Sequence, residues 1–124
     1  MKDVLLVGLG GAAGSVARYV LARALDRWLP TLAFPPGILL VNTLGCLLIG
    51  LALGVSAKGA LLLSDNARLL LATGVCGGFT TFSTFSHQTL TLLSAGRTSA
   101  ALLYVGLSVG LGLGATAVGL WVGR

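Results

Sequence analysis

The chain alternates long apolar stretches with short polar breaks. A helix that crosses a bilayer needs about 20 mainly apolar residues. The pattern therefore predicts four transmembrane helices, at about residues 4–25, 37–55, 67–93 and 99–122. The breaks between them hold the prolines, charged residues and small turn-forming residues that are typical of loops. The first stretch runs on past Gly14, which favours a transmembrane helix over a cleaved signal peptide.

Composition argues against a soluble protein. The 124 residues are 56% hydrophobic and only 9% charged, whereas a soluble domain is about 25% charged. We therefore predict an all-α, multi-pass integral protein of the cell (inner or plasma) membrane, with residues 1–124 in a single domain. A chain this short encloses little by itself, so we expect an oligomer. We expect lipid rather than nucleic acid as a partner, and no enzymatic activity, because no nucleophile–base pair or ligand cluster is visible.

Glycines recur at four-residue spacing in all four predicted helices. Without Cβ atoms, two helices can approach closely and gain dispersion contacts that lipid does not supply. We therefore predict tight helix packing on several faces, including between subunits. The sets are Gly10/Gly14, Gly50/Gly54, Gly74/Gly78, Gly106/Gly110/Gly114 and Gly119/Gly123.

Basic residues are balanced between the two sides of the membrane. With four spans, one side holds Lys2, Lys58, Arg68 and Arg124, and the other holds Arg23, Arg27 and Arg97, with Arg18 near the same end of the first helix. The positive-inside rule then gives no single orientation. Either other features set the topology, or the chain inserts both ways and pairs as an antiparallel homodimer. Such a pair would hold a symmetric site at mid-membrane, as inverted repeats do in larger transporters.

Inside the predicted helices there are hydrogen-bond donors but no carboxylate. Asp3, Asp26 and Asp65 lie at helix ends or in loops, whereas proton-coupled exporters need an intramembrane carboxylate. The formal net charge is +5. A path lined by donors suits an anion better than a cation. The donors considered are Asn42, Thr43, Thr80, Thr81, Ser83, Thr84, Ser86, Tyr104, Ser108 and Thr116.

Asn42 and Arg18 each allow two interpretations. The Asn42 amide either ties two helices together or donates to a passing ligand, since a polar side chain in a span is a functional candidate. Arg18 has no acidic partner nearby in sequence. Its side chain either extends to the membrane interface or sits in a vestibule that attracts anions.

The stretch GVCGGFTTFSTFS, from Gly74 to Ser86, falls at the middle of the third predicted helix. Non-helical backbone at that depth must be buried in protein or line a cavity. A break at Gly77–Gly78 would free carbonyl oxygens, which suit a small hard cation such as Na⁺. The alternative is that the glycines only let helices cross closely.

Three phenylalanines follow this point. At 100° per residue, Phe79, Phe82 and Phe85 would share one face of a helix. They either face lipid or a neighbouring helix, or turn their positive ring edges toward an anion.

At these residues the chain closely resembles the Fluc (CrcB) family of fluoride channels. The resemblance covers essentially the full length. It rests on three motifs: GGAAGSVARY (Gly10–Tyr19), VNTLGCLLIG (Val41–Gly50) and above all GVCGGFTTFSTFS (Gly74–Ser86).

The resemblance implies a dual-topology homodimer with two antiparallel pores and passive fluoride export. It implies one structural Na⁺ at the dimer interface, at the break in the third helix, bound by the backbone oxygens of Gly77 and Thr80. Phe82 and Phe85 would line the pore, Asn42 would donate to the ion, and Arg18 would lie near the vestibule. A polar track would consist of Ser83, Thr84, Tyr104 and Ser108.

Departures from the family pattern are Ile38, where many members have Thr, Gln88, where many have Glu, and Gly112, where Ser is common. They put details of the polar track in question. One competing function is a small dual-topology multidrug-type cation exporter, which the missing intramembrane carboxylate disfavours. The other is a non-transporting membrane subunit held together by glycine packing.

Overall fold

The computed structural model describes residues 1–29, 33–57 and 64–124. Lys58, one of the basic residues counted above, lies outside the described residues. Four helical stretches are long and apolar enough to cross a membrane, and they contain the four predicted segments, which confirms that these segments are helical. The helices are α1 (Lys2–Trp28), α2 (Pro36–Ala57), α3 (Asp65–Arg68), the π-helix η1 (Leu69–Cys76), α4 (Gly77–Phe79), α5 (Phe82–Ser94) and α6 (Thr98–Gly123).

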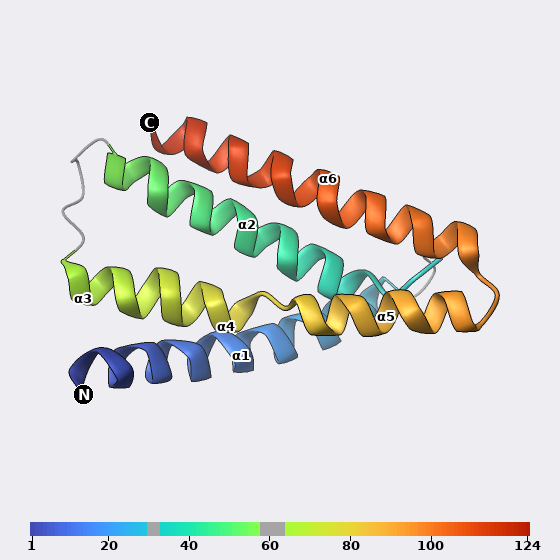
Figure 1. Cartoon of the computed structure of the whole chain (residues 1–124), viewed down its shortest axis with the longest axis horizontal. Coiled ribbons are helices and arrows are strands. Elements are labelled where there is room, and N and C mark those ends of the chain that lie inside the picture. Colours follow the sequence, from blue (N-terminus) through green and yellow to red (C-terminus); the bar gives the residue numbers. More distant parts are fainter. Residues whose placement is uncertain (30–32, 58–63) are drawn as a thin grey trace.

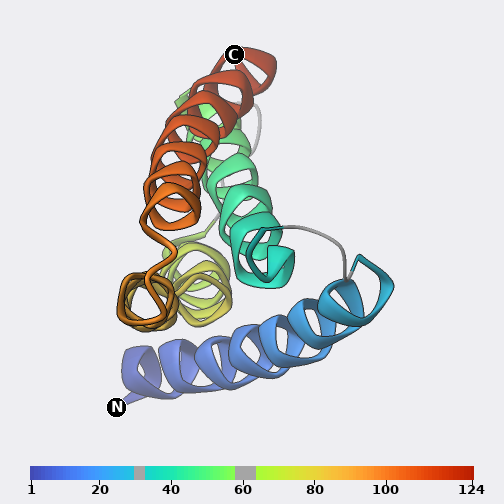
Figure 2. The same cartoon turned by 90° about the vertical axis from the view of Figure 1, so that its right-hand side faces the viewer.

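The four stretches run alternately in opposite directions. Both termini therefore lie at the same end of the molecule (Figure 1). The third stretch, α3 to α5, lies between α1 on one side and the pair of α2 and α6 on the other (Figure 2). The described residues contain helices, turns and bends and no strand.

Local sequence signals explain where α2 begins. Pro36 is its first residue, a position where the missing N–H and the fixed φ of proline cost nothing. The next backbone N–H, that of Gly37, donates to the Asp26 carboxylate of α1 at 2.7 Å. Asp26 thus satisfies one of the free N–H groups at the start of α2 and ties the two helices together.

Glycines bring the helices into backbone contact, largely as their spacing predicts. A Cβ at Gly10 or Gly14 would collide with backbone of η1 and α4, and Cβ atoms at Gly50 and Gly119 would collide across the α2–α6 contact. The same holds for Gly54, Gly74, Gly78 and Gly123. The set Gly106/Gly110/Gly114 behaves differently, because an added Cβ there meets nothing within 4 Å in the described chain. These three glycines do not serve packing within the protomer.

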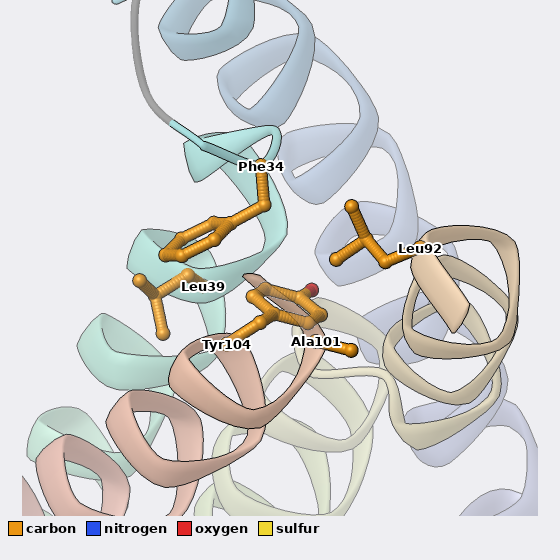
Figure 3. Close-up of a cluster of buried hydrophobic side chains, with 5 residues drawn as sticks. All are labelled: Phe34, Leu39, Leu92, Ala101 and Tyr104. Atoms are coloured by element: carbon orange, nitrogen blue, oxygen red, sulfur yellow. The ribbon is translucent and has the colours of Figure 1, made fainter. Parts of the chain in front are cut away.

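Buried side chains form two clusters beside the third stretch. The first joins Phe34, Leu39, Leu92, Ala101 and Tyr104 (Figure 3). The second joins Ala22, Ile38, Val41 and Phe79. Phe85 is partly buried against both clusters, so α5 is held by the two together.

Candidate functional site

Helical geometry in the third stretch stops after Phe79 and resumes at Phe82. Thr80 (φ −88°, ψ 156°) and Thr81 (φ −151°, ψ 120°) are extended. The expectation that the glycine pair forms the break is wrong in position, because Gly77 is helical (φ −63°, ψ −39°). Gly78 instead permits close packing, since its Cβ would lie 2.9 Å from the Gly11 Cα. The depth of the Thr80–Thr81 break in a membrane stays a prediction.

Asn42 on α2 holds the break in place. Its side-chain oxygen accepts from the Thr81 N–H at 2.8 Å, and its Nδ2 donates to the Thr81 carbonyl at 3.1 Å. The amide therefore does tie two helices together. Nδ2 carries two N–H groups, and the second has no hydrogen-bond partner within the described residues. Asn42 can thus hold Thr81 and still offer one donor to a ligand.

The break deprives the four backbone carbonyls of residues 77–80 of their helical donors. Two of these carbonyls, those of Gly77 and Thr80, are the ones that the resemblance assigns to Na⁺. In a continuous helix the N–H groups of Thr81 and Thr84 would bond to the carbonyls of Gly77 and Thr80. Here the Thr81 N–H donates to Asn42, and the Thr84 N–H donates to the Thr81 hydroxyl at 3.3 Å. Across the described part of the chain, no hydrogen bond to the Gly77 or Thr80 carbonyl replaces them. Both carbonyls are therefore available to another ligand.

One cavity of ≈ 460 Å³ adjoins the break and gathers residues from α2, the third stretch and α6. We call it the first cavity. Its lining includes Asn42, Phe82, Phe85 and Ser108, together with Gly77 just before the break and Thr80 and Thr81 in it. The other lining residues are small or apolar: Gly45, Cys46, Ile49, Ala72, Cys76 and Val109. The Ser108 hydroxyl is buried and has no hydrogen-bond partner in the described structure. The first cavity thus combines two unsatisfied donors, from Asn42 and Ser108, with two aromatic rings.

The three phenylalanines do not share one face. The extended residues Thr80 and Thr81 interrupt the 100° spacing, so the expectation based on a continuous helix is wrong. Phe79 is 7% exposed in the second cluster, whereas Phe82 is 79% exposed. The rings of Phe82 and Phe85 remain neighbours, with centroids 5.5 Å apart and planes inclined by 45°.

The hydroxyls of the expected polar track are divided between different surroundings. The Thr81 hydroxyl lies 3.2 Å from the hydroxyls of both Ser83 and Thr84, and Ser83 is exposed. Tyr104 is fully buried, and its hydroxyl donates to Gln88 Oε1 at 2.5 Å. Their role toward an ion stays a prediction.

Arg18 lies beside a second cavity of ≈ 400 Å³, which it lines together with Thr84 and Gln88. Arg23 and Asp26 line the same cavity. The structure therefore brings Arg18 close to one end of the polar track, as a vestibule would require. Of the departures from the family pattern, Ile38 also lines this second cavity, while a Cβ at Gly112 would be in ordinary contact with Cys46 Sγ, at 3.5 Å.

Sequence reasoning gave no specific role to Thr81, which is central to the break. Thr81 is 8% exposed and caps α5 through its hydroxyl. Threonine is a preferred N-cap residue, so a threonine after an apolar Gly-Gly-Phe run was a usable signal. The sequence marks Gln88 only as a departure from the family pattern, because its bond to Tyr104 joins positions far apart in the sequence.

Comparisons with known proteins agree with the motifs. The family model described as CrcB-like protein, Camphor Resistance (CrcB), matches residues 5–120. A fluoride-specific ion channel FluC of Hyphomonas neptunium is 48% identical over 127 residues, covering 100% of this chain and 97% of that protein. A protein of the same name from Thermus thermophilus is 52% identical over 113 residues, covering 91% of this chain and 88% of that protein. One from Phocaeicola vulgatus is 43% identical over 122 residues, covering 98% of each.

Proposed function

The chain belongs to the CrcB-like family, and from this membership and the cavity beside the break we propose that it is a fluoride-selective channel. It would let fluoride leave the cell passively and so lower cytosolic fluoride. The observation that supports this most is the composition of the first cavity. Donors from Asn42 and Ser108 meet the rings of Phe82 and Phe85 there, and no carboxylate is among the lining residues.

The chemistry of this cavity suits a small, strongly hydrated anion. An anion that leaves water needs donors, and an N–H or O–H that donates to a charged group forms a stronger bond than one between neutral groups. The free N–H of Asn42 and the Ser108 hydroxyl supply such donors. The positive edges of the Phe82 and Phe85 rings can support the anion without holding it permanently. Arg18 beside the second cavity raises the local concentration of anions at one entrance.

An antiparallel homodimer would complete the site. Phe82 is 79% exposed in the single chain, and nothing in the described chain approaches a Cβ built at Gly77. The two residues flank the break, Gly77 in α4 before it and Phe82 at the start of α5 after it. A second copy packed against this face would bury the ring and would bring two breaks together on one symmetry axis. The balanced basic residues are compatible with insertion in both orientations.

Na⁺ fits the break as a structural ion. The carbonyls of Gly77 and Thr80 have lost their helical donors within the described structure, and neutral backbone oxygens of unwound helices are ligands for Na⁺ in membrane proteins. When bound, the ion would neutralise the converging carbonyl dipoles of two subunits. The chain's own contribution is to hold these oxygens in place through Asn42 and the Thr81 cap.

Removal of Na⁺ should therefore slow fluoride flux. We expect reconstituted protein in a large organic cation, such as N-methylglucamine, to lose most of its fluoride flux and to recover it when Na⁺ is returned. A fluoride electrode measures the flux, and size-exclusion chromatography in the same two buffers follows the dimer. If fluoride flux were unchanged after exhaustive replacement of Na⁺ by the organic cation, the proposed structural role of Na⁺ would be wrong.

Cell growth in fluoride tests the proposed function. In cells that lack their own fluoride exporter, the chain should restore growth, and Phe82→Ile should reduce it. Phe82 is largely exposed in the protomer, so its loss leaves the described core intact. The matched control is Leu90→Ile, at an exposed position (62%) on the same helix, which should retain resistance. If the chain is a non-transporting membrane subunit, neither the wild type nor Phe82→Ile should restore growth in fluoride. If it is a multidrug-type exporter, it should give resistance to bulky cations instead.

A further inference from the structure

Tyr104 is held on three sides. It is 0% exposed, and its ring centroid lies 4.9 Å from that of Phe34 and 5.5 Å from that of Phe85. Its hydroxyl donates to Gln88 at 2.5 Å. Phe85 lines the first cavity and Gln88 lines the second. Tyr104 therefore contacts one residue from the wall of each cavity, Phe85 in the first and Gln88 in the second.

Phe34 belongs to no helix, yet it is 6% exposed and part of the first cluster. Figure 3 shows its side chain reaching from the segment before α2 toward Tyr104. Two contacts hold this segment. The Arg97 guanidinium donates to the Ala33 carbonyl, and Asp26 accepts from the Gly37 N–H at 2.7 Å. Phe34 is thus anchored on both sides along the chain.

The turn between α5 and α6 fixes Arg97. Gly96 has φ +73°, its N–H donates to the Leu93 carbonyl at 3.0 Å, and the Arg97 N–H donates to the Leu92 carbonyl at 2.9 Å. This pair of bonds is a Schellman motif, which requires a left-handed residue and therefore favours glycine. The motif fixes the backbone at Arg97, and the Arg97 side chain reaches the Ala33 carbonyl in the segment before α2.

We propose that Phe34 is a positioning residue for the ion pathway. By packing on Tyr104 it keeps the Tyr104 hydroxyl on Gln88 and the Phe85 ring at the wall of the first cavity, and Arg97 holds Phe34 there. This rests on the proposed channel function. Phe34 lines neither of these two cavities, so its influence on the ion is exerted through Tyr104.

A double-mutant cycle tests the proposal in reconstituted protein. Phe34→Leu keeps the position apolar but removes the ring contact, and Tyr104→Phe removes only the hydroxyl. We expect each single variant to slow fluoride efflux by roughly tenfold, and the double variant to be no slower than the slower single, because coupled residues are non-additive. Phe34→Tyr, which keeps the ring, should restore most of the flux. The proposal would be overturned if the two single losses of efflux multiplied in the double variant. It would also be overturned if Phe34→Leu left the efflux rate unchanged.

Arg97 supplies a second test that does not depend on packing, because its side chain is exposed. Arg97→Ala should slow efflux several-fold at both low and high salt, because it removes a hydrogen bond. An effect that disappears at high salt would show that Arg97 only attracts anions by its charge, and would overturn its role in holding Phe34. A wild-type protein without fluoride flux would refute the channel itself, whereas a conducting wild type with insensitive variants would refute only the positioning role.

Discussion

Asn42→Ala is expected to nearly abolish fluoride flux. Asn42 lines the first cavity, and the substitution removes its free N–H as well as the two bonds, of 2.8 and 3.1 Å, that hold Thr81. A hydrogen bond to a charged group contributes about 1.5–3 kcal/mol, so losing the donor alone corresponds to a drop of roughly 10- to 100-fold. The unpaired Thr81 N–H should also lower the free energy of unfolding by about 1–3 kcal/mol. Electrode flux and thermal unfolding of the purified protein measure the two effects.

Two further variants separate the roles of the Asn42 amide. Asn42→Asp keeps an oxygen for the Thr81 N–H but removes both donors and adds a negative charge, so it should fold and yet fail to conduct. Thr43→Ala is the matched control, because the Thr43 hydroxyl donates to the Leu39 carbonyl of its own helix at 2.8 Å. Its flux should stay close to that of the wild type. Normal conduction by Asn42→Asp would mean that the amide only ties α2 to the break.

Gly14→Ala is expected to prevent folding. A Cβ at this position would collide with the Val75 carbonyl oxygen and lie 2.8 Å from the Phe79 nitrogen. Both obstacles are backbone, which cannot rotate away as a side chain can. Overpacking commonly costs about 1–3 kcal/mol, and a collision with backbone should reach or exceed the upper end of that range. We therefore expect little folded protein after extraction and no fluoride resistance in cells.

Gly8→Ala is the control for this substitution. Gly8 lies on the same helix, and an added Cβ there meets nothing within 4 Å. Replacing glycine with alanine inside a helix raises helix propensity, so Gly8→Ala should express and conduct at least as well as the wild type. Equal yields of the two variants would show that the contact between α1 and the third stretch does not require glycine at position 14.

The membrane-spanning helices could be predicted because the bilayer restricts the options. An apolar segment of about 20 residues in lipid must satisfy its backbone internally, and a helix does this. The glycine spacing likewise indicated the backbone contacts of Gly10, Gly50 and Gly119. At Gly110 the described chain leaves the added Cβ in open space, so packing between subunits at this face stays a prediction. Spacing identifies a face where close approach is possible and does not identify what covers it.

The position of the break could not be read from local propensity. Gly77–Gly78 is the weakest helical dipeptide by propensity, but packing against α1 keeps it helical. Thr81 leaves the helix because the Asn42 amide, 39 positions earlier, replaces its helical partner. With this bond in place the helix is interrupted, and Phe82 no longer lies on the same face as Phe79. The wrong position of the break therefore also made the predicted common face of the phenylalanines wrong.

Fluoride efflux from liposomes is the measurement that tests the central claim most directly. Vesicles loaded with potassium fluoride and containing the purified chain are diluted into fluoride-free Na⁺ buffer, with valinomycin to carry the compensating K⁺ and equal pH on both sides. We expect rapid fluoride release at the electrode that requires no proton gradient and is lost in Asn42→Asp. If folded wild-type protein released no fluoride above empty vesicles, or only with an imposed proton gradient, the passive channel would be contradicted.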